Sequence, residues 1–68
     1  MSIALGKHIR NIRQTQKVSQ TELAERIEYL NQSQISKIEK GDRKATAEDL
    51  IQIAKALGVT LEDIVSGG

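Results

Sequence analysis

Apolar side chains recur along the chain at the three- and four-residue steps of an α-helix. Leu5, Ile9 and Ile12, for example, share one face of a first helix. No stretch shows the strict alternation of a half-buried strand, and no proline interrupts the pattern. The helices are expected near residues 3–16, 19–29, 31–40 and 47–57, with a last short turn or helix at 61–65. The pattern therefore predicts an all-α fold, a compact five-helix domain.

The residues between the apolar stripes carry helix start and stop signals. Ser19 and Glu22 have the spacing of a capping box, in which each side chain hydrogen-bonds the other residue's backbone N–H. The same spacing recurs, less ideally, in the pairs Asn31 and Gln34, Thr46 and Asp49, and Thr60 and Asp63. Gly41 and Gly58 stand where a left-handed residue would end the third and fourth helices. We assign residues 1–65 to one domain and 66–68 to a flexible tail or the start of a linker.

Composition excludes several classes of protein. A chain of 68 residues holds one domain at most. With no cysteine and a single histidine, His8, it can form neither a disulfide nor a zinc finger. Tyr29 is the only aromatic residue, so the stacking platforms of single-strand binders cannot be built. We find no nucleophile–base pair, metal site, cofactor motif or membrane segment, and expect a cytoplasmic protein that is not an enzyme.

The expected third helix divides sharply between an apolar and a polar face. Ile35 and Ile38 point one way, and the opposite side carries serines, amides and lysines without an acid. The first segment, residues 1–20, adds four cations and no acid, although the net charge of the chain is only +1. Amide and lysine side chains can pair with the base edges of the DNA major groove. The third helix is therefore the candidate recognition element.

Two sequence elements carry a resemblance to a known family. The stretches Ser19–Ala24 and Gln34–Gly41 together resemble the helix-turn-helix domain of lambdoid phage repressors and Cro, and of the wider Xre-like regulators. The similarity extends over residues 5–65. It implies that the second helix crosses the DNA backbone and the third enters the major groove.

The resemblance also implies roles for individual residues. Gln32, Ser33 and Lys37 match base-reading positions, and we add Gln34 and Ser36, beside them on the same helix, as further base-reading candidates. Gln20, Lys40, Arg43 and Lys44 match positions close to the DNA backbone, and we add Thr21 and Arg10 as further backbone candidates. Arg13 and Glu39 match an arginine–glutamate pair that links the first helix to the end of the third. Arg13 and Glu39 lie at the edges of their apolar stripes, and this position also favours a half-buried, bidentate ion pair.

The sequence departs from the family pattern at two turns. The segment Glu28-Tyr29-Leu30 is one residue longer than usual and has no glycine. We expect Leu30 to fill the core from this turn, with Tyr29 or Glu28 as the extra residue. Lys17 stands where a glycine often ends the first helix, so it must adopt a strained left-handed conformation or end the helix differently.

The function expected from these features is a sequence-specific regulator of transcription, a repressor in preference to an activator. A module this small covers little DNA, so we expect a homodimer on a palindromic operator of double-stranded DNA. Leu61, Ile64 and Val65 are candidates for part of the dimer interface, unless a further C-terminal domain dimerises the protein. The alternative is a protein-binding module, an antitoxin or antirepressor for which DNA binding is secondary.

Overall fold

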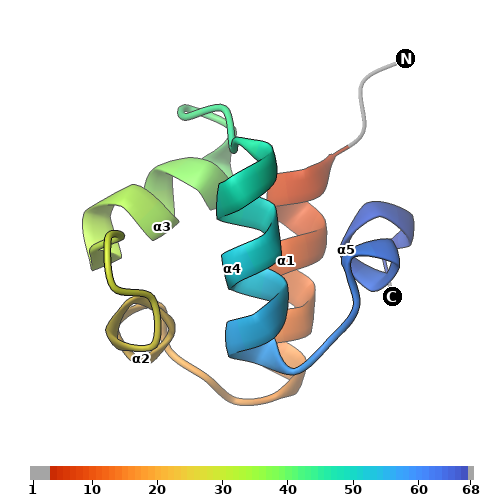
Figure 1. Ribbon diagram of the computed structural model, residues 1–68, viewed down its shortest axis with the longest axis horizontal. Coiled ribbons are helices and arrows are strands. Elements are labelled where there is room, and N and C mark those ends of the chain that lie inside the picture. The colour runs from red at the N-terminus through yellow and green to blue at the C-terminus, as the bar shows by residue number, and fades with distance from the viewer. Residues whose placement is uncertain (1–3, 68) are drawn as a thin grey trace.

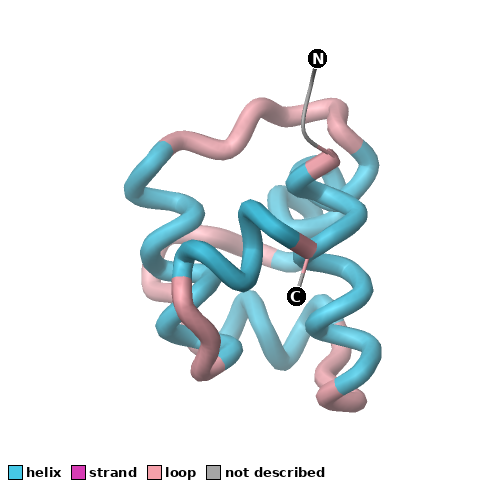
Figure 2. Tube along the Cα trace, turned by 90° about the vertical axis from the view of Figure 1, so that its right-hand side faces the viewer, coloured by secondary structure: helices cyan, strands magenta, loops and turns pink. Residues whose placement is uncertain are grey.

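The computed structural model describes residues 4–67 as five helices, which confirms the predicted all-α fold (Figure 1). The helices are α1 (Leu5–Thr15), α2 (Gln20–Glu25), α3 (Gln32–Lys40), α4 (Ala47–Leu57) and α5 (Leu61–Ser66). Figure 2 shows them joined by loops, without a strand in the described part of the chain. No helix within residues 4–67 combines the length and apolar character that a membrane crossing requires.

The predicted start signals are all used. Each of α2, α3, α4 and α5 begins with a complete capping box, including the three less ideal pairs. Gly41 and Gly58 follow α3 and α4 in the left-handed conformation, with φ of 83° and 67°, as expected. These caps satisfy backbone groups that a helix end leaves without partners, so helices as short as six residues can form here.

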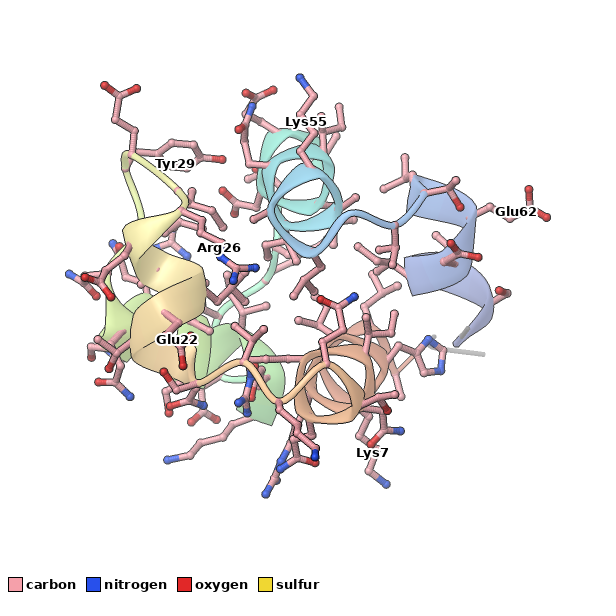
Figure 3. The ribbon with its side chains drawn as sticks, turned by 90° about the horizontal axis from the view of Figure 1, so that it is seen from below. Lys7, Glu22, Arg26, Tyr29, Lys55 and Glu62 are labelled. Atoms are coloured by element: carbon pink, nitrogen blue, oxygen red, sulfur yellow. The ribbon has the colours of Figure 1, made fainter. Side chains whose placement is uncertain are left out.

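One core joins all five helices. Its fully buried side chains come one from each helix: Ile9, Leu23, Ile35, Ile53 and Ile64. α1 and α4 lie at the centre, with α2 and α3 on one side and α5 on the other (Figures 1 and 3). Contacts between α1 and α3, between α2 and α3, and between α1 and α5 hold these layers together. The helix-turn-helix is therefore packed on a framework built by the other three helices.

The second helix is shorter than predicted, because α2 ends at Glu25 and not at residue 29. The backbone N–H groups of Arg26 and Ile27 bond three residues back, to Leu23 and Ala24, and this tightening ends the helix. The turn then brings Leu30 into the core, where it is buried as expected. Apolar periodicity continues through residue 30 and therefore does not indicate this early end.

Two further boundaries depend on left-handed residues. Lys17, which follows α1, has φ of 59°. Of the two expected alternatives, a left-handed Lys17 or a different helix end, the chain therefore adopts the strained left-handed conformation. Ser66, which we assigned to a tail, is the last residue of α5, and Gly67 follows it with φ of 89°. Gly68, the end of that predicted tail, lies outside the described residues.

Candidate nucleic-acid interface

α3 presents a polar outer face without an exposed acid. Gln32, Ser33, Lys37 and Lys40 are exposed, and Ile35 and Ile38 are buried beneath them. Glu39 is the only acid of this helix, and it is 7% exposed. The solvent-exposed face of α3 therefore carries amides, a hydroxyl and two cations.

The charge of Glu39 is neutralised inside the domain by Arg13 of α1. Arg13 Nε donates to Oε2 at 2.7 Å and Nη2 donates to Oε1 at 3.0 Å, so the pair is bidentate. Arg13 Nη1 also donates to the carbonyl of Val18, at 2.8 Å. The arrangement fixes the end of α3 against α1 and the turn that follows it, because both side chains are held by more than one bond.

A chain of amide hydrogen bonds runs from this pair to the start of α3. Gln20 Nε2 donates to Glu39 Oε1 at 3.1 Å, and Gln32 Nε2 donates to Gln20 Oε1 at 2.6 Å. Gln20 was predicted beside the DNA backbone, and the structure places it between the buried acid and the first residue of α3. The exposed amide of Gln32 is therefore held in a defined direction before any ligand binds.

The other candidates on α3 differ in how free their side chains are. Gln34 is half-buried, and its Oε1 accepts the N–H of Asn31 at 2.9 Å in the capping box. Its oxygen is thus engaged at the helix start, which sequence spacing had also indicated. Ser36 is half-buried, whereas Ser33 and Lys37 are exposed. Among the described residues, Ser33 and Lys37 are exposed on α3 and make no side-chain hydrogen bond, whereas the amide of Gln32 is bonded to Gln20.

A hollow open to solvent separates α1, the start of α2 and α3. Its walls include Lys7, Arg10, Thr21, Gln32, Ser36 and Lys40. Lys7 points away from α1 into solvent (Figure 3). Four cations and several hydroxyl and amide groups line this hollow, and one of these cations, Arg13, is paired with Glu39, the acid in its wall. The surface suits a polyanion that runs past α3.

The loop after α3 continues the cationic surface. The N–H groups of Asp42 and Arg43 both donate to the carbonyl of Lys37, at 2.9 and 3.2 Å, which turns the chain sharply. Lys44 is exposed and Arg43 half-buried. Both line a second hollow, together with Lys7 and Lys40. The predicted backbone candidates of α1, α3 and the loop thus lie on adjoining surfaces.

Gly6 is a structural residue that the sequence analysis missed. A Cβ atom at this position would overlap the carbonyl oxygen of Ile38 and lie 2.7 Å from that of Glu39. The start of α1 therefore packs directly on the backbone at the end of α3. Gly6 lies inside a helical stripe without a turn signal, so its spacing gave no hint of this contact.

A tyrosine–aspartate hydrogen bond also escaped the sequence analysis. The Tyr29 hydroxyl donates to Asp49 Oδ1 at 2.9 Å, although Tyr29 belongs to the α2–α3 turn and Asp49 to the first turn of α4. Desolvation and this bond raise the pKa of Tyr29. Burial alone would raise the pKa of Asp49, but hydrogen bonds from Thr46 and Tyr29 and the charge of Arg43 outweigh it and lower that pKa.

α5 contributes differently from what was expected. Leu61 and Val65 are 42% and 40% exposed, but Ile64 is fully buried in the core and cannot reach a second copy. Ile64 is therefore removed from the candidate dimer interface. Its carbonyl lies 2.8 Å from His8 Nδ1, so the one histidine links α1 to α5.

Comparison with known proteins agrees with the architecture. The family described as Helix-turn-helix matches residues 9–64. Two curated proteins of Mycobacterium tuberculosis, from strains CDC 1551 / Oshkosh and ATCC 25618 / H37Rv, are each 47% identical over 57 residues, or 84% of this chain. Both are named uncharacterized HTH-type transcriptional regulators, and the matched region is 40% of their length. No solved structure gives a significant match.

Proposed function

We propose that this chain, which belongs to the helix-turn-helix family, is the DNA-binding domain of a transcriptional repressor. α3 enters the major groove of double-stranded DNA, and Gln32, Ser33 and Lys37 contact base edges there. The names of the mycobacterial relatives support regulation of transcription. The protein acts in the cytoplasm, where its DNA partner lies.

The observation that carries this proposal is the placement of the acid in α3. Glu39 is buried and paired with Arg13, so α3 offers base edges and phosphates a face without exposed negative charge. An ordinary solvated helix usually exposes both signs. The pair also orients the helix, because it joins the end of α3 to α1.

The surrounding cations supply affinity without sequence preference. Arg10, Lys40 and Lys44 are exposed on surfaces that flank α3, and phosphate contacts by such residues set the register on the duplex. Gln20, Thr21 and Arg43 complete the proposed backbone contacts. The Gln20 amide reaches the DNA next to Gln32, to which it is already bonded.

The proposal is tested by selecting bound duplexes from a random pool. We expect one enriched sequence, arranged as two inverted half-sites about one helical turn apart. Binding to the selected duplex should weaken steeply between low and physiological salt, since counterions are released from the phosphates. A pool that shows no enrichment at any salt concentration contradicts the proposal.

Two lysines of α3 separate base contacts from backbone contacts. Lys37→Ala should relax preference at one base pair of each half-site. Lys40→Ala should weaken all duplexes alike and reduce the salt slope by about one unit. Lys55→Ala is the matched control, because Lys55 lies on α4, far from Lys7 (Figure 3), and should change neither quantity. Equal binding by all three variants contradicts these roles.

Dimerisation belongs to the same proposal. The exposed side chains Leu61 and Val65 form part of the contact between two copies on one operator. Replacing both by serine should lower the cooperativity of binding to two half-sites while a single half-site is bound as before. Unchanged cooperativity would assign dimerisation to another part of the protein.

A further inference from the structure

The turn between α2 and α3 is held to the domain by few contacts. Within residues 4–67, the backbone N–H groups of Glu28, Tyr29 and Leu30 make no hydrogen bond to a backbone carbonyl. Leu30 is buried, and Tyr29 reaches Asp49 through its hydroxyl, which is 2.9 Å from Oδ1. The second half of this turn, residues 28–30, is therefore held by one apolar anchor, Leu30, and one polar anchor, Tyr29. The first half is held by buried Ile27 and by the bond of Arg26 to Ala56.

Asp49 is a rigid partner for that hydroxyl. It is 2% exposed, its Oδ2 accepts the N–H of Thr46 at 3.0 Å, and its own N–H donates to Thr46 Oγ1 at 3.1 Å. Both carboxylate oxygens are thus engaged, one by the cap of α4 and one by Tyr29. Asp63 has the equivalent position in the capping box of α5, but it is only half-buried, and within residues 4–67 its carboxylate accepts only from Thr60.

The anchor lies directly ahead of α3. Only Leu30 and Asn31 separate Tyr29 from Gln32, the first residue of that helix. Figure 3 shows the Tyr29 ring directed from the turn toward α4. Arg26 makes a second connection, because its Nη1 donates to the carbonyl of Ala56 at the other end of α4, at 3.0 Å. A recognition site works only when its groups are held to within about 0.5 Å.

We infer that Tyr29 is a positioning residue for α3. Its hydrogen bond to Asp49 sets where the first turn of α3 lies against the bases, and so determines sequence preference more than overall affinity. The inference rests on the proposed DNA-binding function. It concerns Gln32 and Ser33, which follow the anchored turn, and not Lys37, which lies beyond the first turn of the helix.

Tyr29→Phe tests the inference, since it keeps the ring and removes only the hydroxyl. We expect the ratio of affinities for the selected duplex and a random duplex to fall about fivefold or more. Base preference should decrease at the base pairs contacted by Gln32 and Ser33 and stay unchanged at the base pair contacted by Lys37. The salt slope should stay constant, because no phosphate contact is removed.

A matched control separates positioning from a general loss of stability. Gln16→Met also removes one side-chain hydrogen bond, from Nε2 to the carbonyl of Leu57 at 2.7 Å, at the opposite end of α4 from Asp49. Both variants are compared at a temperature where circular dichroism shows them folded. Gln16→Met should leave the affinity ratio unchanged.

Asp49→Ala provides the second variant, on the other side of the same bond, because asparagine could still hydrogen-bond the Tyr29 hydroxyl. It should reduce preference at the same base pairs, and the double variant should lose no more than Tyr29→Phe alone. An unchanged ratio in Tyr29→Phe, or losses that simply add in the double variant, would overturn the inference. A parent protein that selects no duplex would instead overturn the proposed function.

Discussion

α3 and α5 lie on opposite sides of the α1–α4 centre and are held there in similar ways (Figure 1). Each begins with a capping box, and each is bonded to α1. Glu39 of α3 pairs with Arg13 of α1, and the carbonyl of Ile64 in α5 bonds His8 of α1. Their outer faces differ. α3 buries its acid and exposes amides and cations, whereas α5 exposes the apolar Leu61 and Val65. The same framework thus presents a polar, cationic face on α3 and a partly apolar face on α5.

The bonds that join α3 and α5 to α1 also differ in kind, and substitutions can measure that difference. α3 is fixed by two opposite charges removed from water, while α5 is fixed by a buried isoleucine and one hydrogen bond to a histidine. Removing one member of a buried ion pair leaves an uncompensated charge, which costs more than removing a neutral partner.

Breaking the α3 anchor should have the largest effect. Arg13→Ala leaves the Glu39 carboxylate buried with Gln20 as its remaining partner, and should lower the free energy of unfolding by about 3–5 kcal/mol. Urea denaturation followed by circular dichroism measures this loss. The double variant Arg13→Met, Glu39→Leu should recover part of it. A loss below about 1 kcal/mol for Arg13→Ala would show that the pair is well solvated.

Truncation within α5 should separate its core residue from its surface residues. Ile64→Ala opens a cavity and should cost about 2–5 kcal/mol of unfolding free energy. Leu61→Ala should change it by no more than about 0.5 kcal/mol at concentrations where the protein is monomeric. Equal losses would mean that Leu61 is buried, contrary to its 42% exposure.

The buried carboxylate of Asp49 should make the domain sensitive to acid. Its pKa is lowered from the ordinary 3.8, so the unfolded chain binds this proton more readily than the folded domain. The stabilisation is complete above the ordinary value and is lost as pH falls through the lower folded pKa. Thermal melts from pH 6 to pH 2 should show this loss, and Tyr29→Phe should make it smaller because one cause of the shift is gone. An identical acid profile for both proteins would contradict the role of the phenol.

The smallest effect is expected at Lys17. Its φ of 59° strains a residue with a Cβ atom, so Lys17→Gly should raise the free energy of unfolding by about 0.5–1 kcal/mol. The turn lies at the end of α1, away from the start of α3 that Tyr29 anchors, so sequence preference should not change. A melting temperature below that of the parent would show that the entropy of glycine in the unfolded chain outweighs the strain.

Sequence spacing predicted the fold well because its signals are local. Capping pairs such as Thr60 and Asp63, and glycines such as Gly58, act within a few residues of one another. Periodicity located the core stripe on each helix, but it could not end α2 at Glu25. That end depends on Leu30 entering a core made by distant parts of the chain.

Contacts in the candidate site between residues that are distant along the chain could not be predicted from the sequence. Lys37 and Ser33 could be placed on the outer face of α3 by helical geometry alone. The bond of Gln20 to Gln32, and that of Tyr29 to Asp49, join residues whose separation along the chain follows no helical period. Ile64 shows the converse error, because an apolar residue on the last helix fits the core as well as an interface.

The proposed function requires that the outer face of α3, and not that of α5, binds DNA. The most direct measurement is a nuclear magnetic resonance titration of the labelled domain with the selected duplex. We expect the largest amide shifts at Gln32, Ser33 and Lys37, with small shifts along α5. Shifts concentrated on α5, or none at saturating duplex, would contradict the proposed function.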